Sequence, residues 1–116
     1  MANQEHLDIL KQGVEVWNKW RKERPDIQPD LSSIDLSANS YTLDHTLVGA
    51  NLNVAKLMNT NLQDTNLTKA DLSYANLLGA LLSGANLNGA NLTLADLMAT
   101  NLVGANLNDA VRREVT

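Results

Sequence analysis

The sequence predicts an all-β solenoid preceded by one helix, and two periodicities support this prediction. In the first 23 residues, apolar side chains recur at spacings of three and four, the pattern of one face of an α-helix. From residue 47 to residue 107, Leu recurs every five residues without a gap. A chain of 116 residues with these patterns is expected to form one domain whose core repeats a single shape.

The predicted helix spans residues 4–23 as a single element. Acidic side chains near its start and basic ones near its end suit the helix dipole. Pro25 and Pro29 are expected to end the helix and hold an extended linker, so that residues 1–29 form a capping unit. Val16 is expected to widen its apolar face. The residues expected to cover the first coil are Leu7, Leu10, Val14, Trp17 and Trp20.

The five-residue period excludes both regular helix and flat strand for the rest of the chain. Five residues advance an α-helix by about 500°, so successive Leu residues would lie about 140° apart and define no face. Side chains of a strand alternate with a period of two, so an odd spacing sends successive Leu residues to opposite sides. The chain must therefore turn a corner in every repeat. The predicted core ladder comprises Leu52, Leu57, Leu62, Leu67, Leu72, Leu77, Leu82, Leu87, Leu92, Leu97, Leu102 and Leu107.

The sequence of each repeat resembles the pentapeptide-repeat family. Ala or Thr stands two residues before nearly every Leu and Asn or Asp directly before most, giving runs such as Ala-Asn-Leu-x-x and Ala-Asp-Leu-x-x. The resemblance covers residues 30–110 and implies a right-handed, four-sided β-helix of about four coils, with the Leu and the small residue pointing inward. The opening helix with its two Trp residues resembles the N-terminal caps of family members. We therefore expect the β-helix at residues 30–111 and a short tail at residues 112–116.

The repeat register slips once, near its start. Leu31, Leu36 and Tyr41 are five residues apart, but Leu47 lies six beyond Tyr41, so one residue is expected to be inserted within residues 42–46. With four repeats per coil, each residue stacks on the one twenty positions later. One such outward column, expected to hydrogen-bond along the axis through stacked amides, comprises Asn66, Asn86 and Asn106.

Two outward columns carry apolar side chains and form the candidate protein-contact patch. They are expected to meet around a single corner, with Lys56 and Asp96 at the rim, as an unusually continuous apolar surface. The patch predicts contact with an unknown protein partner, and the alternatives are self-association or tolerated surface residues. A homodimer through the C-terminal coil, where Arg112 stands at a Leu position, is the other predicted self-contact. The patch comprises Val54, Tyr74, Leu94, Met58, Leu78 and Met98.

The inventory of reactive side chains predicts no enzyme. There is no Cys, His6 is expected to be a solvated residue of the first helical turn, and His45 to fill the inserted turn by hydrogen bonding. The scattered aspartates Asp64, Asp71 and Asp96 suggest no metal cluster. No catalytic residue, cofactor or metal ligand is therefore predicted.

Charge and hydropathy narrow the function further. Residues 25–111 hold two bases against eight acids, the opposite of the basic stripe that nucleic-acid binding requires. No signal peptide or membrane span is evident, so we expect a cytoplasmic protein that binds neither nucleic acid nor membrane. The sequence predicts a non-enzymatic scaffold for protein interaction or structure. The family resemblance implies one alternative, a DNA-mimicking regulator of a type II topoisomerase. A ~20 Å mimic of duplex DNA would need roughly twelve negative charges, whereas the two bases and eight acids of residues 25–111 give a net charge of −6.

Overall fold

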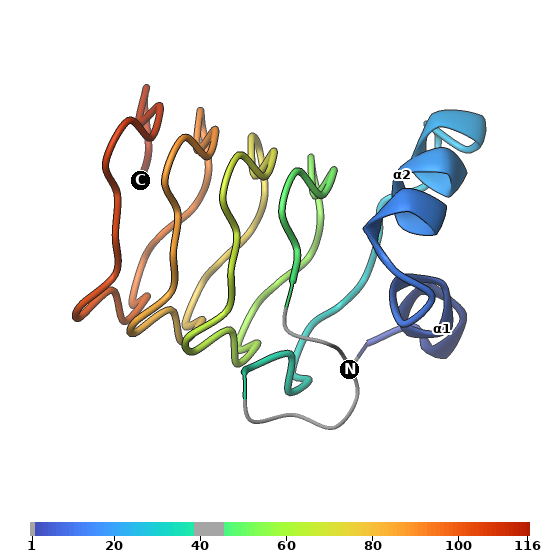
Figure 1. Ribbon diagram of the computed structural model, residues 1–116, viewed down its shortest axis with the longest axis horizontal. Helices are drawn as coiled ribbons and strands as arrows, with labels where there is room; N and C mark the ends of the chain where they lie inside the picture. Colours follow the sequence, from blue (N-terminus) through green and yellow to red (C-terminus); the bar gives the residue numbers. More distant parts are fainter. Residues whose placement is uncertain (1, 39–45) are drawn as a thin grey trace.

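The computed structural model describes residues 2–38 and 46–116. Helices α1 (Gln4–Leu10) and α2 (Val14–Glu23) precede a stack of coils joined by parallel β-bridges. Figure 1 shows the coils side by side, with both helices at the N-terminal end of the stack. Within the described residues the bridges are isolated pairs, because the chain turns a corner soon after each of them. The architecture is a β-helix solenoid.

The stacking register is twenty residues over most of the chain. Bridges join Thr46 to Asn66, Asn66 to Asn86, and Asn86 to Asn106. The supporting backbone hydrogen bonds are short, as between the Leu67 N–H and the Asn86 carbonyl oxygen at 2.7 Å. Four repeats of five residues therefore complete each turn of this segment, as the family resemblance implies.

Each repeat turns its corner through a β-turn. The Ala55 N–H donates to the Leu52 carbonyl oxygen at 3.1 Å, and the same bond recurs every five residues, as from Ala80 to Leu77 at 2.9 Å. The third residue of the turn has a positive φ, +58° at Val54, which is the signature of a type II turn. Glycine meets this demand without strain at Gly84, where φ is +70°.

The Asn or Asp that stands before most of the ladder Leu residues serves the corner of its own repeat. The Oδ1 atoms of Asn66, Asn86 and Asn106 accept hydrogen bonds from the backbone N–H two residues ahead, at 3.1, 3.0 and 2.9 Å. Such a side-chain acceptor satisfies a turn N–H that would otherwise depend on water. The prediction that these amides form an axial ladder is therefore wrong for their oxygen atoms.

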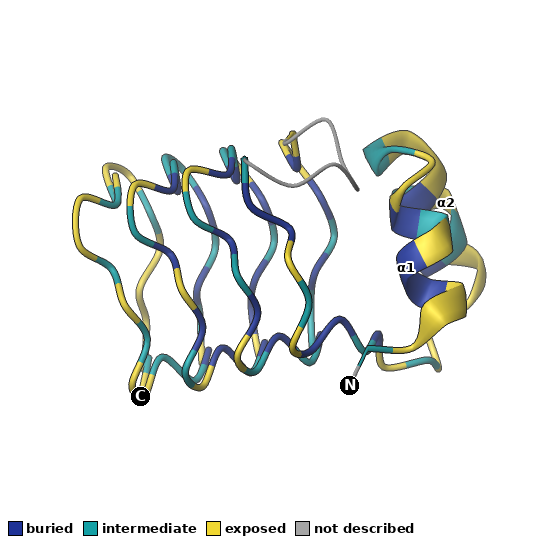
Figure 2. Ribbon diagram, turned by 90° about the horizontal axis from the view of Figure 1, so that it is seen from below, coloured by how far each residue is buried: buried dark blue, intermediate teal, exposed yellow. Residues whose placement is uncertain are grey.

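The Leu side chains fill the interior of the stack. Figure 2 shows buried residues recurring along the middle coils, whereas the last coil is coloured as intermediate and exposed. The ladder residues from Leu52 to Leu92 are at most 1% exposed, whereas Leu97, Leu102 and Leu107 are half-buried in the last coil. A Thr at the small inward position adds a hydrogen bond, since the Thr60 Oγ1 donates to the Leu31 carbonyl oxygen at 2.7 Å.

The first coil is longer than the sequence predicted. Bridges join Asp30 to Lys56 and Asp35 to Asn61, a spacing of 26 residues in place of twenty. The prediction that a single residue lengthens this coil is therefore wrong, because the spacing exceeds twenty by six residues. The predicted site of the insertion, 42–46, lies outside the described residues except for Thr46.

The C-terminal residues remain part of the stack. The Leu94 N–H donates to the Arg113 carbonyl oxygen at 2.8 Å, and the Leu97 N–H donates to that of Thr116 at 3.0 Å. The expected tail at residues 112–116 is therefore wrong for the backbone, which continues the coil. Arg112 takes the position of a Leu, and its side chain is exposed.

The N-terminal segment forms two helices, so the prediction of one continuous helix over residues 4–23 is wrong. Asn3 caps α1, since its Oδ1 accepts hydrogen bonds from the N–H groups of Glu5 at 2.9 Å and His6 at 3.3 Å. Gly13 separates the helices with a φ of 105°, a conformation that helical residues do not adopt. The two helices contact each other but differ in direction (Figure 1).

Helix α2 provides hydrogen-bond partners for the exposed edge of the first coil. The Asn51 carbonyl oxygen accepts from Trp17 Nε1 and from Arg21 Nη1, both at 2.8 Å. Arg21 Nη2 donates to the Asn53 carbonyl oxygen at 2.9 Å, and Asn18 Oδ1 accepts from the Asn51 N–H at 2.8 Å. In later coils these backbone groups pair with the preceding coil, so α2 takes the place of the missing strand.

The predicted capping face lies largely against the first coil. Leu10 and Trp17 are fully buried, Leu7 is 9% exposed, and Val14 and Trp20 are half-buried against the core. The expectation that Val16 widens this face is wrong, because its side chain is 41% exposed.

Candidate functional site

The six candidate contact residues lie on one side wall of the stack, which we call the apolar face. Backbone hydrogen bonds fix the first column, with the Val54 N–H donating to Ser73 and the Tyr74 N–H to Thr93, at 3.0 and 2.8 Å. Turns occur both at residues 53–54 and at residues 58–59. The prediction of a single corner is therefore wrong: the two columns stand at successive corners and border a wall. At one border are Val54, Tyr74 and Leu94, and at the other are Met58, Leu78 and Met98.

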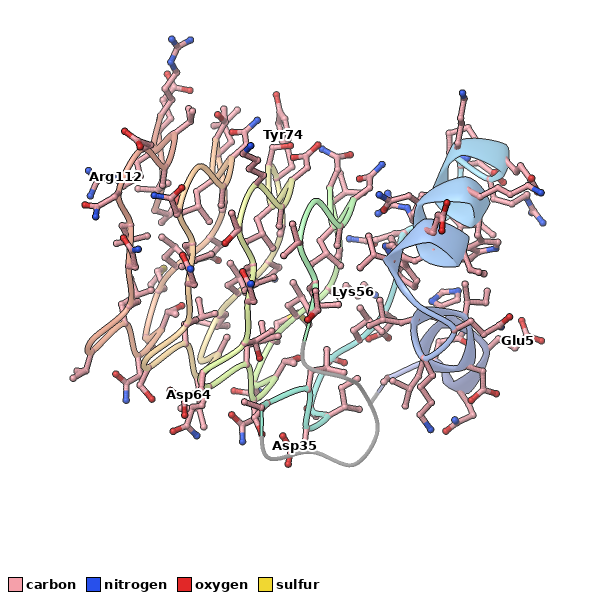
Figure 3. All side chains as sticks on the ribbon, in the orientation of Figure 1. Glu5, Asp35, Lys56, Asp64, Tyr74 and Arg112 are labelled. Carbon is pink, nitrogen blue, oxygen red and sulfur yellow. The ribbon has the colours of Figure 1, made fainter. Side chains whose placement is uncertain are left out.

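The apolar face is open to solvent. Tyr74 and Met98 are 58% and 56% exposed, Leu78 and Leu94 are also exposed, and Val54 and Met58 are half-buried. Figure 3 shows Tyr74 projecting from the upper corner of the stack, diagonally across from Asp64. Surfaces of this kind are uncommon on monomeric proteins and often mark contacts.

One column of the face places bulky side chains in an unfavourable backbone conformation. Val54, Tyr74 and Leu94 have φ values of 58°, 60° and 57°. This left-handed region costs a residue other than Gly, Asn or Asp about 1–2 kcal/mol, and it is least suited to a β-branched side chain. In another column, the same turn position is occupied by Gly84 and, one coil further on, by Gly104. The fold therefore does not require large side chains at turn positions with a positive φ.

A polar column runs down the middle of the face. Lys56, Asn76 and Asp96 are bridged to one another in turn, and all three side chains are half-buried. Asp96 Oδ1 accepts a hydrogen bond from the Met98 N–H at 3.0 Å, and Asn76 Oδ1 accepts from the Leu78 N–H at 3.1 Å. The wall thus has apolar borders around a central column whose charge runs from positive at Lys56 through neutral to negative at Asp96. The Asp30 carboxylate, bridged to Lys56, precedes this run.

The sequence reasoning missed four further exposed apolar residues of the β-helix, which are Val48, Leu81, Val103 and Val111. Leu81 is 37% exposed and Val103 is 75% exposed on the wall beyond the Met58 column. Leu81 stands where other repeats have Asn or Asp, and this departure was a signal in the sequence.

The other acidic and His residues considered from the sequence are either separated in the structure or outside the described residues. In the repeat register, Asp64, Asp71 and Asp96 belong to three different columns, and the described residues include no group of acidic or His side chains that could hold a metal. His45 lies outside the described residues. Neither described helix is long and apolar enough to cross a membrane.

The expectation of a solvated His6 is wrong. The His6 side chain is only 8% exposed, and its Nδ1 accepts a hydrogen bond from the Asp30 N–H at 3.0 Å. Its ring lies 5.1 Å from that of Trp20. Burial lowers the pKa of His6, and the positive charge of Arg21 acts in the same direction, against the opposing effects of Asp30 and Glu5. The neutral ring therefore belongs to the contact between α1 and the first coil.

Acidification is expected to weaken this contact. Because the pKa of His6 in the folded protein is below its ordinary value of about 6.5, the unfolded chain takes up the proton first. The contribution of the neutral His6 ring to the free energy of unfolding is therefore complete above pH 6.5 and is lost as the pH falls below this value. Urea unfolding between pH 5 and 8 checks this by comparing the wild type with His6→Gln, which should lack that part of the pH dependence. Equal pH dependence in both proteins would contradict the role of His6.

Comparisons with known proteins find the same repeat in a family model and in solved structures. Residues 46–73 and 75–111 match the family model of pentapeptide repeats, in eight copies. A pentapeptide repeat protein from the Arabidopsis thaliana thylakoid lumen has a similar structure, with 29% identity and a TM-score of 0.57 over 74% of this chain. HetL of Nostoc sp. strain PCC 7120, a pentapeptide repeat protein involved in heterocyst differentiation regulation, is 34% identical over 76% of this chain, with a TM-score of 0.44.

The coverage of these two structures is partial. The chain spans 59% of the Arabidopsis protein and 44% of HetL. No curated protein matches the sequence. The family model covers more than half of the chain, and its repeats coincide with the corners and the Leu ladder described above. The chain therefore belongs to the pentapeptide-repeat family.

Proposed function

We propose that the chain is a non-enzymatic scaffold that binds a protein through its apolar face. In this proposal, the chain is a right-handed, four-sided β-helix of about four coils, capped at its N-terminal end by α1 and α2. The observation that carries the proposal is the run of large apolar side chains at positions where φ is positive in three successive coils, half-buried at Val54 and exposed at Tyr74 and Leu94.

The backbone of the wall favours recognition through side chains. In the middle coil, the Asn76 N–H donates to Ala55 and the Leu77 N–H donates to Asp96, at 3.0 and 2.8 Å. These groups are paired along the stack, so a partner cannot add a strand to the wall. Affinity would come from apolar burial, for which Met58 and Met98 supply adaptable side chains.

The proposal is tested by placing charges on the face without disturbing the core. Leu78→Glu with Met98→Glu should fold normally but lose any association that the wild type makes, whether with itself or with other proteins. The matched control is Asn88→Glu with Asn108→Glu, which adds the same charge at an outward column of another corner. Light scattering measures self-association, and affinity capture from extracts of the source cells measures other contacts. An association profile unchanged by the face variant would refute the proposal.

A further inference from the structure

The charges at the centre of the apolar face point to its partner. We propose that the face binds a second copy of this chain, packed wall against wall with the two stacks running in opposite directions. The inference rests on the proposed function, because it names the partner of the same face. It is carried by the order Lys56, Asn76, Asp96 along the central column.

A two-fold axis that lies between the two walls, perpendicular to the stacking axis of the coils, makes the central column of one copy complementary to the central column of the other. The axis passes through the level of Asn76 and reverses the order of the coils in the second copy. Lys56 of each copy then faces Asp96 of the other, and Asn76 faces its own counterpart. Two symmetry-related opposite-charge pairs form, and an isologous contact of this kind is the commonest symmetry among homodimers.

The parallel arrangement is disfavoured by the same charges. With the axis along the stack, Lys56 would face Lys56 and Asp96 would face Asp96. Like charges placed opposite one another oppose association. The direction of the second copy therefore follows from the charge order.

The apolar borders also match in the antiparallel arrangement. The axis keeps each column opposite itself, so that Tyr74 and Leu78 meet their own counterparts. The smaller Val54 faces the larger Leu94, and Met58 faces Met98. Apolar borders thus meet apolar borders on both sides of the charge pairs.

The charges at the centre are available for such a contact. Among the described residues, ion pairs within 4.0 Å join only Lys19 to Glu23 and Arg24 to Asp26. Neither Lys56 nor Asp96 lies within 4.0 Å of an opposite charge in the described part of its own chain, although Asp30 is bridged to Lys56 and the charge of Lys56 helps to lower the pKa of Asp30. Burying these two groups against each other would therefore replace water and break no ion pair.

The size of the face predicts a weak dimer. Six apolar and three central side chains per copy fall well short of the roughly 20–30 residues per side of a standard stable interface. The dimer should therefore depend on concentration. Sedimentation equilibrium and light scattering up to roughly 1 mM protein suit the micromolar to millimolar affinities of small interfaces.

Charge reversal tests the pairing. Lys56→Glu alone and Asp96→Lys alone should each weaken self-association roughly tenfold, because two attractive pairs become repulsive. The double variant should recover the wild-type dimer, and mixing the two single variants should yield a heterodimer. Self-association that is equal in the wild type and both single variants would overturn the inference.

Cross-linking tests the direction of the second copy, and the absence of Cys leaves a clean background. Packed walls lie about 10 Å apart, which a short bis-maleimide spans. Met58→Cys mixed with Met98→Cys should cross-link efficiently, whereas either variant alone should not. Equal cross-linking within the single variants would overturn the antiparallel arrangement.

The failure of this inference is distinguishable from that of the proposed function. If the wild type stays monomeric at all concentrations, the inference that a second copy is the partner is wrong. If the Leu78→Glu with Met98→Glu variant then also loses a captured protein that the control retains, the face binds a different partner and the proposed function stands.

Discussion

Leu77→Lys is expected to abolish the folded state. The Leu77 side chain is fully buried at the middle of the ladder, where the inward positions carry Leu, Ala or Thr and offer no carboxylate to a buried ammonium group. An unpaired charge in such an interior costs several kcal/mol or more, against a total stability of about 5–15 kcal/mol for a typical domain. Because each coil is stabilised by its neighbours, disruption at this level separates the coils on either side. Circular dichroism and urea unfolding would show the loss of the cooperative transition.

Graded controls separate burial from charge in this experiment. Asn88→Lys adds the same charge at an outward turn position and should leave the unfolding midpoint nearly unchanged. Leu77→Ala should cost about 2–5 kcal/mol, and Leu107→Ala should cost less, because Leu107 is only half-buried. A soluble Leu77→Lys protein with the wild-type spectrum and midpoint would show that the assignment of inward positions is wrong.

The repeat unit was predictable from the sequence because its demands are local. A five-residue Leu period fits neither helix nor strand, so a corner in every repeat was the remaining solution. Turn hydrogen bonds such as that from Ala55 to Leu52 recur from the Leu47 repeat to the Leu107 repeat. The role of the Asn before the Leu was missed because two acceptable partners existed, the next coil and the next corner. The nearer partner is favoured because the turn N–H needs an acceptor.

The irregular parts were less predictable because they depend on contacts between distant residues. Two registers fit the slip before Leu47, a coil longer by one residue or by six. The bridges from Asp30 to Lys56 and from Asp35 to Asn61 distinguish them. Gly13 was a visible signal for a helix break, but apolar spacing continues across it. The buried position of His6 follows from the return of the chain at Asp30, which local pattern does not encode.

The candidate face was predictable as a set of residues but not as a shape. A spacing of twenty residues identified both apolar columns in advance. Whether they share a corner or border a wall depends on where each turn falls, which the turns at residues 53–54 and 58–59 decide. That difference matters chemically, because a wall places Lys56, Asn76 and Asp96 between the columns and gives the face its charge order.

Trp17→Ala is expected to release α2 from the stack and to destabilise the first coil more than the last. Trp17 is fully buried, its Nε1 donates to the Asn51 carbonyl oxygen at 2.8 Å, and its ring lies 5.1 Å from that of Trp20. Removing a buried aromatic side chain of this size costs about 3–5 kcal/mol.

The distribution of the loss along the stack is the informative measurement for Trp17→Ala. Hydrogen exchange should show weaker protection of the Leu52 and Leu57 amides, while those of Leu87 and Leu92 change less, because a solenoid transmits stability through nearest neighbours. Trp17→Phe keeps most of the ring but removes the Nε1 donor. Its free energy of unfolding should fall by only about 1 kcal/mol, since Arg21 still donates to the Asn51 carbonyl oxygen. Val16→Ala, at an exposed position, should change little. Equal loss of protection in every coil would instead show that the helices and the whole stack unfold as one cooperative unit, and that α2 stabilises the entire β-helix and not its first edge alone.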